Sequence, residues 1–168
     1  MPTTTTPATE HQARWEEIVH DPSLRDLSYK VETNATGQIV LSPHTAEHAD
    51  LQEHIQDLLR AHAPEGRQPP EYPITTSEGV KQADVVWMSS ERRADMKKTG
   101  DPPTLAPELC VEVLSPNNRW VNIEEKIGLY REAGADEVWV VDTDRQVRFF
   151  GEEEMEASTL APDFPTAV

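Results

Sequence analysis

The sequence predicts an α/β fold in which a central mixed sheet is flanked by helices. Two observations support this class. Segments with helical periodicity alternate with short strand-like runs, in the order helix, two strands, helix, strands, helix, two strands. The runs 109–114 and 137–142 are apolar on both faces, which is typical of strands covered by helices on each side. A length of 168 residues suits one domain. We therefore expect a disordered N-terminus over residues 1–9, which is rich in Thr and Pro, and a single domain over residues 10–168.

The first part of the domain predicts two helices around a β-hairpin. Residues 11–20 form a short helix that ends at Asp-Pro. Residues 27–33 and 38–41 form two strands, because the intervening Asn-Ala-Thr-Gly is a hairpin turn signal. Residues 45–62 form a helix with Thr45 as its N-cap. Its apolar stripe consists of Leu51, Ile55, Leu58 and Leu59.

The second part predicts the central sheet and its crossover helix. A loop over 64–73 precedes a strand that opens at Asp84, and the strand that contains Glu112 ends at a Ser-Pro-Asn-Asn break. The following helix is stopped by Gly134. The remaining elements are an extended segment at 74–76, a charged helix at 90–98, strands at 137–142 and 146–150, and an acidic tail from residue 151.

Composition limits the classes of function. The formal net charge of −16 arises from 31 acidic and 15 basic residues, and it opposes non-specific attraction to nucleic acid. Only five of the cations are lysines, so the charge suits either work in high salt or ordinary solubility. The single cysteine, Cys110, excludes an internal disulfide. With no apolar run of about 20 residues and no signal-like start, we expect a cytoplasmic protein with no membrane segment.

Two carboxylates lie in runs that are otherwise apolar: Asp84 opens the first, and Glu112 lies inside the second. A buried ionised carboxylate must be paired, bound to a metal or neutralised. A divalent cation such as magnesium, or manganese in its place, could satisfy both if the two strands are neighbours, with the carbonyl of Val113 as a further ligand. The alternatives are that Asp84 caps the loop before its strand and that Glu112 forms a buried ion pair.

Three other side chains are candidates for the same pocket. On the helix after the Glu112 strand, Ile123, Ile127 and Tyr130 share one stripe, and Lys126 falls within it. Its alternative role is to cover the apolar face with its stem while the ammonium reaches water. His48 projects onto the apolar stripe of its helix, and Glu32 lies in the first strand, so both are candidate supporting groups that also suit a core or surface role.

Several other sites are excluded. The sequence contains no Gly-x-Gly-x-x-Gly motif and no Gly-x-x-x-x-Gly-Lys-Ser/Thr loop for phosphate binding. It lacks a Gly-x-Ser-x-Gly nucleophile elbow. Cys110 lies in mid-strand, which is too buried for a nucleophile.

One long run carries a family resemblance. The string APELCVEVLSPNN over residues 106–118, followed by AGADEVW over 133–139, resembles the Uma-type restriction endonuclease family of the PD-(D/E)XK nuclease superfamily. The resemblance spans about residues 21–150. It includes, in the family's order, Val31-Glu32, Gly37, Ser42-Pro43, His48, Gly79-Val80, Asp84 to Trp87, Glu125-Lys126 and Leu129-Tyr130.

The resemblance implies a restriction-endonuclease-like core with Asp84 as the motif aspartate and Glu112 as the motif acid. Ala83 replaces the usual motif proline, and Leu114 occupies the usual position of the motif lysine. In this family the lysine is transferred to the following helix, which implies Lys126. If that transfer does not hold, the site binds metal without cleaving.

The expected function is magnesium- or manganese-dependent hydrolysis of DNA, with Asp84, Glu112 and Lys126 as catalytic residues and Glu32 and His48 in support. A homodimer is expected by analogy with domains that cut two strands. The alternative is a catalytically weak or inert nuclease-like domain that acts as an acidic binding or oligomerisation module. The basic cluster Arg92, Arg93, Lys97 and Lys98 would favour DNA binding if it lay beside the site.

Overall fold

In the computed structural model, which describes residues 6–43 and 45–168, four α-helices flank a six-stranded mixed sheet. None of the helices in these ranges is long and apolar enough to cross a membrane. The helices are α1 (Ala8–Val19), α2 (Ala46–His62), α3 (Ser90–Lys97) and α4 (Trp120–Glu132), with a short 3-10 helix at Pro22–Leu24. The strands are β1 (Tyr29–Thr33), β2 (Ile39–Pro43), β3 (Pro70–Thr76), β4 (Gly79–Trp87), β5 (Leu109–Val113), β6 (Glu137–Val141), β7 (Val147–Phe150) and β8 (Glu154–Met155).

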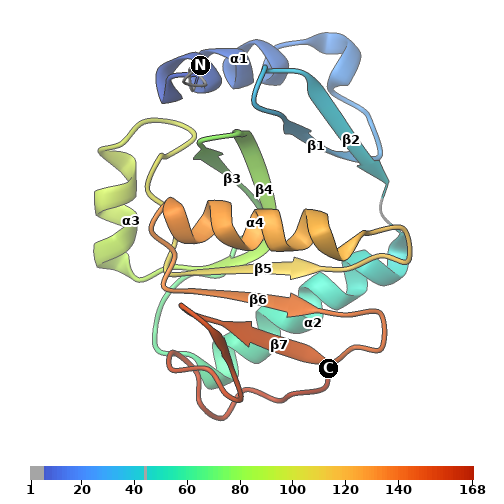
Figure 1. Cartoon of the computed structure of the whole chain (residues 1–168), viewed down its shortest axis with the longest axis vertical. Coiled ribbons are helices and arrows are strands. Elements are labelled where there is room, and N and C mark those ends of the chain that lie inside the picture. The colour runs from blue at the N-terminus through green and yellow to red at the C-terminus, as the bar shows by residue number, and fades with distance from the viewer. Residues whose placement is uncertain (1–5, 44) are drawn as a thin grey trace.

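The sheet has the order β3-β4-β5-β6-β7-β8, and every neighbouring pair is antiparallel except β5 and β6. A parallel pair needs a crossover, which α4 provides. Figure 1 shows α4 in front of the sheet and α2 behind it. The predicted α/β class with a mixed sheet between helices is confirmed.

The alternation of side chains in β5 decides which face receives Glu112. Val111 and Val113 pack in the core that contains α2, whereas Cys110 packs with Tyr130 of α4. Successive residues of a strand point to opposite faces. Glu112 therefore lies on the α4 side of the sheet, below the crossover helix.

β1 and β2 form a separate two-stranded ribbon rather than an extension of the main sheet. A small core that contains Trp15 and Ile18 of α1 and Val80 of β4 anchors the ribbon. At the turn into β4, Gly79 has φ +100°, and a Cβ there would lie 2.5 Å from the carbonyl oxygens of Thr33 and Asn34. This glycine lets the end of β1 approach β4 closely.

The observed boundaries differ from the predicted ones in the middle of the chain. β3 begins at Pro70, inside the predicted loop, and β4 begins at Gly79 rather than at Asp84. Prolines at 70 and 73 are tolerated because β3 is an edge strand. Asp84 is therefore a mid-strand residue, and the interpretation of it as a strand-entry cap is wrong.

The N-terminal helix begins earlier than predicted. α1 starts at Ala8, so residues 8 and 9 are helical and the predicted disordered segment over 1–9 extends too far. Residues 1–5 lie outside the described part of the chain. The N-cap of α2 is as predicted, since the Thr45 side chain accepts a hydrogen bond from the His48 backbone N–H at 3.2 Å.

Candidate active site

Neighbouring strands bring Asp84 and Glu112 together. Val85 of β4 pairs with Val111 of β5, and continuing this antiparallel register by one residue places Asp84 opposite Glu112. The backbone N–H of Val113 donates to Asp84 Oδ2 at 2.7 Å. The Asp84 carboxylate thus takes the place of a backbone acceptor at the end of the β4–β5 pairing. Both carboxylates are buried, with exposures of 1% and 3%.

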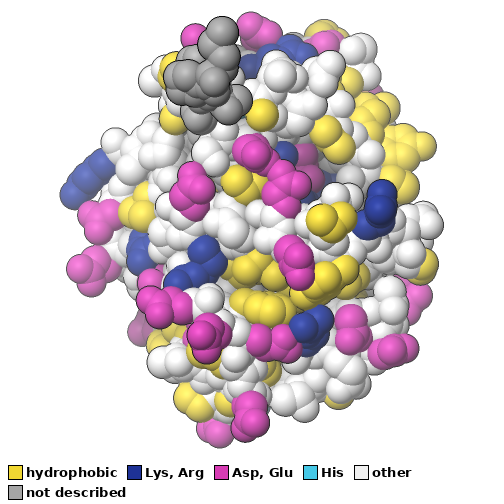
Figure 2. All heavy atoms as spheres, in the orientation of Figure 1, with side chains coloured by type: hydrophobic (Ala, Val, Ile, Leu, Met, Phe, Trp, Pro, Cys, Tyr) yellow, Lys and Arg dark blue, Asp and Glu magenta, His cyan; other side chains and the backbone are white. Residues whose placement is uncertain are grey.

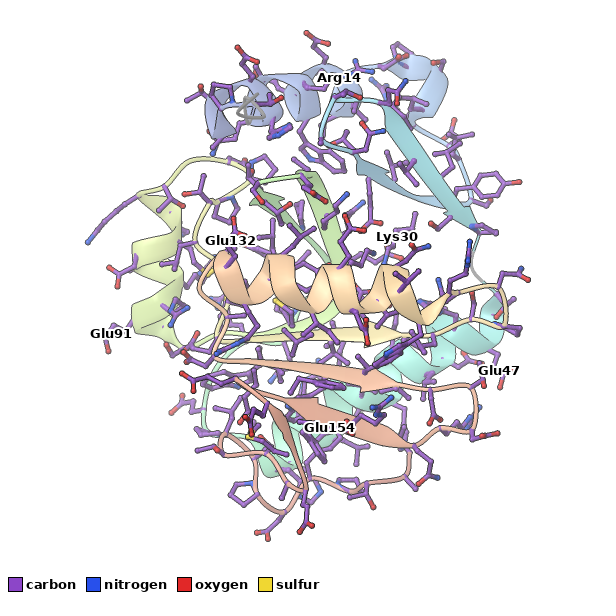
Figure 3. All side chains as sticks on the ribbon, viewed as in Figure 1. Arg14, Lys30, Glu47, Glu91, Glu132 and Glu154 are labelled. Atoms are coloured by element: carbon purple, nitrogen blue, oxygen red, sulfur yellow. The ribbon has the colours of Figure 1, made fainter. Side chains whose placement is uncertain are left out.

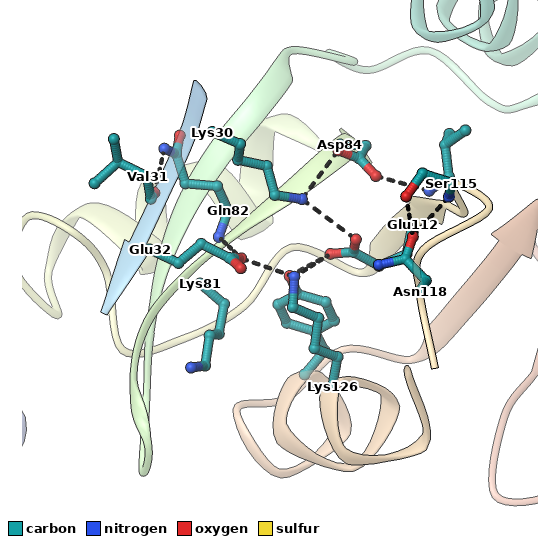
Figure 4. A network of polar contacts seen from close by, with 12 residues as sticks. Lys30, Val31, Glu32, Lys81, Gln82, Asp84, Glu112, Ser115, Asn118 and Lys126 are labelled. Atoms are coloured by element: carbon teal, nitrogen blue, oxygen red, sulfur yellow. Dashed lines mark hydrogen bonds and ion pairs between the residues drawn. The ribbon is translucent and has the colours of Figure 1, made fainter. Parts of the chain in front are cut away.

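An ammonium group lies between the two carboxylates. Lys30 Nζ is 3.0 Å from Asp84 Oδ1 and 3.4 Å from Glu112 Oε2, and the Lys30 side chain is only 10% exposed. Figure 4 shows this side chain reaching from the β1 ribbon to both acids. Lys30 was not among the predicted site residues, although Lys30 and Glu32 are two residues apart in one strand and must share a face.

Lys126 and Glu32 form a second part of the same cluster. Lys126 Nζ is 2.8 Å from Glu32 Oε2 and 3.6 Å from Glu112 Oε1. The Tyr130 hydroxyl, one turn further along α4, donates to Glu112 Oε1 at 2.7 Å. Glu32 is fixed from the other side, since its Oε2 accepts from the backbone N–H of Gln82 at 2.7 Å. The helix projection thus places Lys126 correctly beside Glu112, and it missed the Tyr130 hydroxyl.

Two side chains from the N-terminal part of α2 also contact Asp84. His48 Nε2 hydrogen-bonds to Asp84 Oδ1 at 3.2 Å. One turn later, the Gln52 amide donates to the Asp84 backbone carbonyl at 3.2 Å. The structure therefore brings all five predicted side chains, Asp84, Glu112, Lys126, Glu32 and His48, into one cluster with Lys30.

The cluster opens into a cavity of about 620 Å³ between the β1–β2 ribbon, α2 and α4. Its lining includes Val113 and a third lysine, Lys81, whose ammonium donates to the Thr33 carbonyl at 2.7 Å. No residue of α3 lines this cavity. Figure 3 shows Lys30 between the ribbon and α4, whereas Glu91 of α3 lies on the far side of the molecule.

Arg92, the first residue of the predicted basic cluster on α3, has a structural role. Arg92 donates to the backbone carbonyls of Ala106 and Gly134, both at 2.9 Å. Its guanidinium thereby joins α3 to the loop before β5 and to the end of α4. None of Arg92, Arg93, Lys97 and Lys98 lines the cavity, so the condition under which this cluster would favour DNA binding is not met.

Comparison with known proteins identifies the family of the chain. The model of the Uma2 family, described as "Putative restriction endonuclease", matches residues 15–164. The chain belongs to the Uma2 family. None of the curated proteins with which the sequence was compared matches it.

A solved structure has the same fold as this Uma2 chain. It is described as "a putative nuclease belonging to DUF820" from Anabaena variabilis. The two share a TM-score of 0.58 at 16% sequence identity, over 72% of this chain and 71% of that one. The likeness at this identity concerns the fold, and it supports the restriction-endonuclease-like core.

The charges of the Uma2 site do not compensate its carboxylates equally. Burial lowers the pKa of Lys30, but Asp84 and Glu112 outweigh burial and raise it, so this ammonium stays charged. Burial would raise the pKa of Asp84, yet Lys30 and His48 hold that pKa below its usual value. In contrast, burial raises the pKa of Glu112, and the charges of Asp84 and Glu32 add to this despite the two lysines. Glu112 is therefore the carboxylate of the cluster whose negative charge is least compensated.

The donor set fits a magnesium-type ion. Among residues 6–43 and 45–168, no three or more His, Cys, Asp or Glu side chains are grouped to hold a metal. However, one oxygen each of Asp84 and Glu112 already faces the single cationic atom Lys30 Nζ. Magnesium is commonly held by one or two carboxylates, with water and substrate phosphate as the other ligands. Two carboxylate side chains are thus enough protein ligands for a magnesium-type ion.

Proposed function

We propose that this Uma2 domain is a metal-dependent endonuclease that hydrolyses phosphodiester bonds in DNA. The observation that carries the proposal is the pair of buried carboxylates, Asp84 and Glu112, which share one cation and line an open cavity. Membership of the Uma2 family, described as "Putative restriction endonuclease", supports the same reaction. A divalent ion would also offset the negative charge of the protein where a phosphate approaches.

In this proposal, Asp84, Glu112 and the carbonyl of Val113 hold Mg²⁺ or Mn²⁺. A metal ion bound there supplies Lewis-acid charge to the phosphate. Lys126 stabilises the negative charge that develops on the phosphate, or orients the attacking water. Glu32 positions Lys126 through their 2.8 Å ion pair, and His48 positions Asp84 through its hydrogen bond.

The test is cleavage of plasmid and single-stranded DNA with Mg²⁺ or Mn²⁺, at low and at molar salt, because the acidic composition suits either condition. Cleavage is expected with metal and is expected to stop with EDTA. Lys126→Ala should lower the rate by about 10² to 10³, the typical loss for one group that stabilises the transition state. Lys97→Ala is the matched control, since Lys97 is exposed on α3 outside the cavity. A Lys126→Ala protein that cuts like wild type would contradict the role of this lysine.

One observation favours the alternative of a catalytically weak or inert domain that acts as an acidic binding module. Figure 2 shows acidic side chains spread over the visible face, with Lys and Arg only in scattered positions. The lysines of the cavity, Lys30, Lys81 and Lys126, all contact protein oxygens. A folded protein that cuts no DNA at any salt concentration would favour this alternative.

We also propose a homodimer, because a domain with one site must act twice to cut both strands. Tyr29 and Leu41 lie on the same face of the β1–β2 ribbon and are large apolar side chains with 44–45% exposure, so they offer a surface for association. Light scattering should give twice the chain mass of 18.9 kDa. A monomer at assay concentrations would contradict the dimer and leave the chemistry of the site unaffected.

A further inference from the structure

Lys30 occupies the place that a metal ion would need. Its ammonium lies 3.0 Å from Asp84 Oδ1 and 3.4 Å from Glu112 Oε2, and these are the carboxylates to which the proposed function assigns the metal. An ammonium and a divalent cation repel one another, and both seek the same oxygens. The two cannot occupy this position together.

Lys30 reaches the site from a different structural element than the two carboxylates, so its ammonium can move independently of them. Asp84 and Glu112 belong to the main sheet, whereas Lys30 belongs to the β1–β2 ribbon. Glu32 and Thr33 join the ribbon to β4 without Lys30. The Glu32 carboxylate accepts from the backbone N–H of Gln82, and the Thr33 hydroxyl accepts from that of Val80. The ammonium of Lys30 can therefore leave the carboxylates without disturbing these contacts. It lies on the wall of the 620 Å³ cavity, and its four-carbon stem can turn into that space.

Lys126, the second lysine of the cluster, does not lie between the two carboxylates. Lys126 Nζ is 3.6 Å from the other oxygen of Glu112, Oε1, and its closest partner is Glu32 at 2.8 Å. Asp84 forms its ion pairs with Lys30 and His48. Lys126 is thus placed beside the carboxylate pair rather than between its members, and a metal ion there would not require it to move.

We propose that Lys30 is a built-in counter-cation that a divalent metal ion must displace before this site becomes active. This inference rests on the proposed function. Without metal, Lys30 compensates two buried carboxylates and keeps the strands β4 and β5 paired beside the cavity. With metal, its ammonium moves into the cavity. The exchange lowers the affinity of the site for metal and couples metal binding to a rearrangement of the cavity wall.

The experiment is a calorimetric titration of the full chain with Mn²⁺ at fixed pH, comparing wild type, Lys30→Met and Lys126→Met. Methionine keeps an unbranched stem and removes the charge. Lys30→Met should bind Mn²⁺ about tenfold tighter than wild type or better, since the competing cation is gone. Lys126→Met should change the affinity less, because Lys126 does not stand between the carboxylates.

Thermal unfolding gives a second readout that does not depend on activity. Lys30→Met without metal should unfold at a lower temperature than wild type, because two buried carboxylates lose their shared partner. Saturating Mn²⁺ should raise its unfolding temperature by more than it raises that of wild type. Lys30→Gln, which keeps a hydrogen-bonding amide, serves if the methionine variant does not fold.

The outcomes separate the two proposals. If wild type binds Mn²⁺ and neither Lys30 variant binds it more tightly, the exchange is wrong and the metal site stands. If no protein binds Mn²⁺, both the exchange and the proposed metal dependence are wrong. Weaker binding by the Lys30 variants would also overturn the exchange, because it would make Lys30 a support of the metal site.

Discussion

Replacing Asp84 with Asn is expected to abolish metal-dependent DNA cleavage, with a loss of about three orders of magnitude or more. Asn keeps the shape of the side chain and removes the charge that a divalent ion requires. Metal-ion catalysis supplies several kcal/mol of transition-state stabilisation, and each 1.36 kcal/mol is a factor of ten in rate. The affinity for Mn²⁺ should fall with the rate, whereas loss of Lys126 should lower the rate more than the affinity.

The initial rate of nicking of supercoiled plasmid, measured over a range of metal concentrations, checks this prediction. Asp84→Asn must be shown to fold, because Asp84 accepts from Lys30 and His48 on one oxygen and from the Val113 backbone on the other. The Asn amide donates on one side and so cannot satisfy all of these groups. Asp136→Asn is the matched control, since the Asp136 side chain is 67% exposed and pairs only loosely with Arg92 at 3.7 Å. A folded Asp84→Asn protein that cuts DNA at the wild-type rate would contradict the role of Asp84 in the site.

Local patterns in the sequence were sufficient to locate those residues of the site whose position depends on one strand or one helix alone. A carboxylate in an apolar strand must face a compensating group, and this rule located Asp84 and Glu112. The periodicity of one helix was sufficient to place Lys126 on the inward face. Both inferences use burial and spacing within one element, which the chain encodes over a few residues.

Lys30 could not be found in this way because its position depends on contacts between distant segments. Its partners Asp84 and Glu112 are 54 and 82 residues away along the chain. Nothing local shows that the β1–β2 ribbon leans over β4 rather than extending the main sheet. For the same reason the sequence left open whether the basic residues of α3 lie beside the site, and Arg92 donates to backbone carbonyls instead.

The burial rule also identifies a carboxylate that lies outside the site. Glu137 in β6 is only 4% exposed, and its backbone pairs with Leu109 of β5. Its carboxylate accepts from the Trp139 indole at 2.8 Å and the Ser158 hydroxyl at 2.6 Å. It also accepts from the backbone N–H groups of Thr159 and Leu160, at 2.7 and 3.2 Å. Burial of a carboxylate thus predicts that it is compensated, and does not predict whether a cation or neutral donors compensate it.

Replacing Glu137 with Ala is therefore expected to lower the free energy of unfolding by about 3 kcal/mol or more, because four donors lose a charged acceptor. The candidate cluster around Asp84 and Glu112 should be unaffected, so metal affinity and cleavage per folded molecule should match wild type. Urea denaturation measures the first and the plasmid assay the second. Glu153→Ala is the control, since Glu153 is exposed near the same tail. A stable Glu137→Ala protein that has lost cleavage would place Glu137 in the function instead.

A double variant tests whether Glu137 acts by holding the C-terminal tail. The Ser158 hydroxyl donates to Glu137 and accepts from the Ala161 backbone N–H at 2.9 Å, so it links the carboxylate to the next turn of the chain. Glu137→Ala and Ser158→Ala share this hydrogen bond. Their combined loss of stability should be smaller than the sum of the single losses by about 1 kcal/mol, as for residues of one network. Strict additivity would mean that the Ser158 hydroxyl and the Glu137 carboxylate stabilise the tail independently, with the carboxylate acting on the tail through the backbone N–H groups of Thr159 and Leu160.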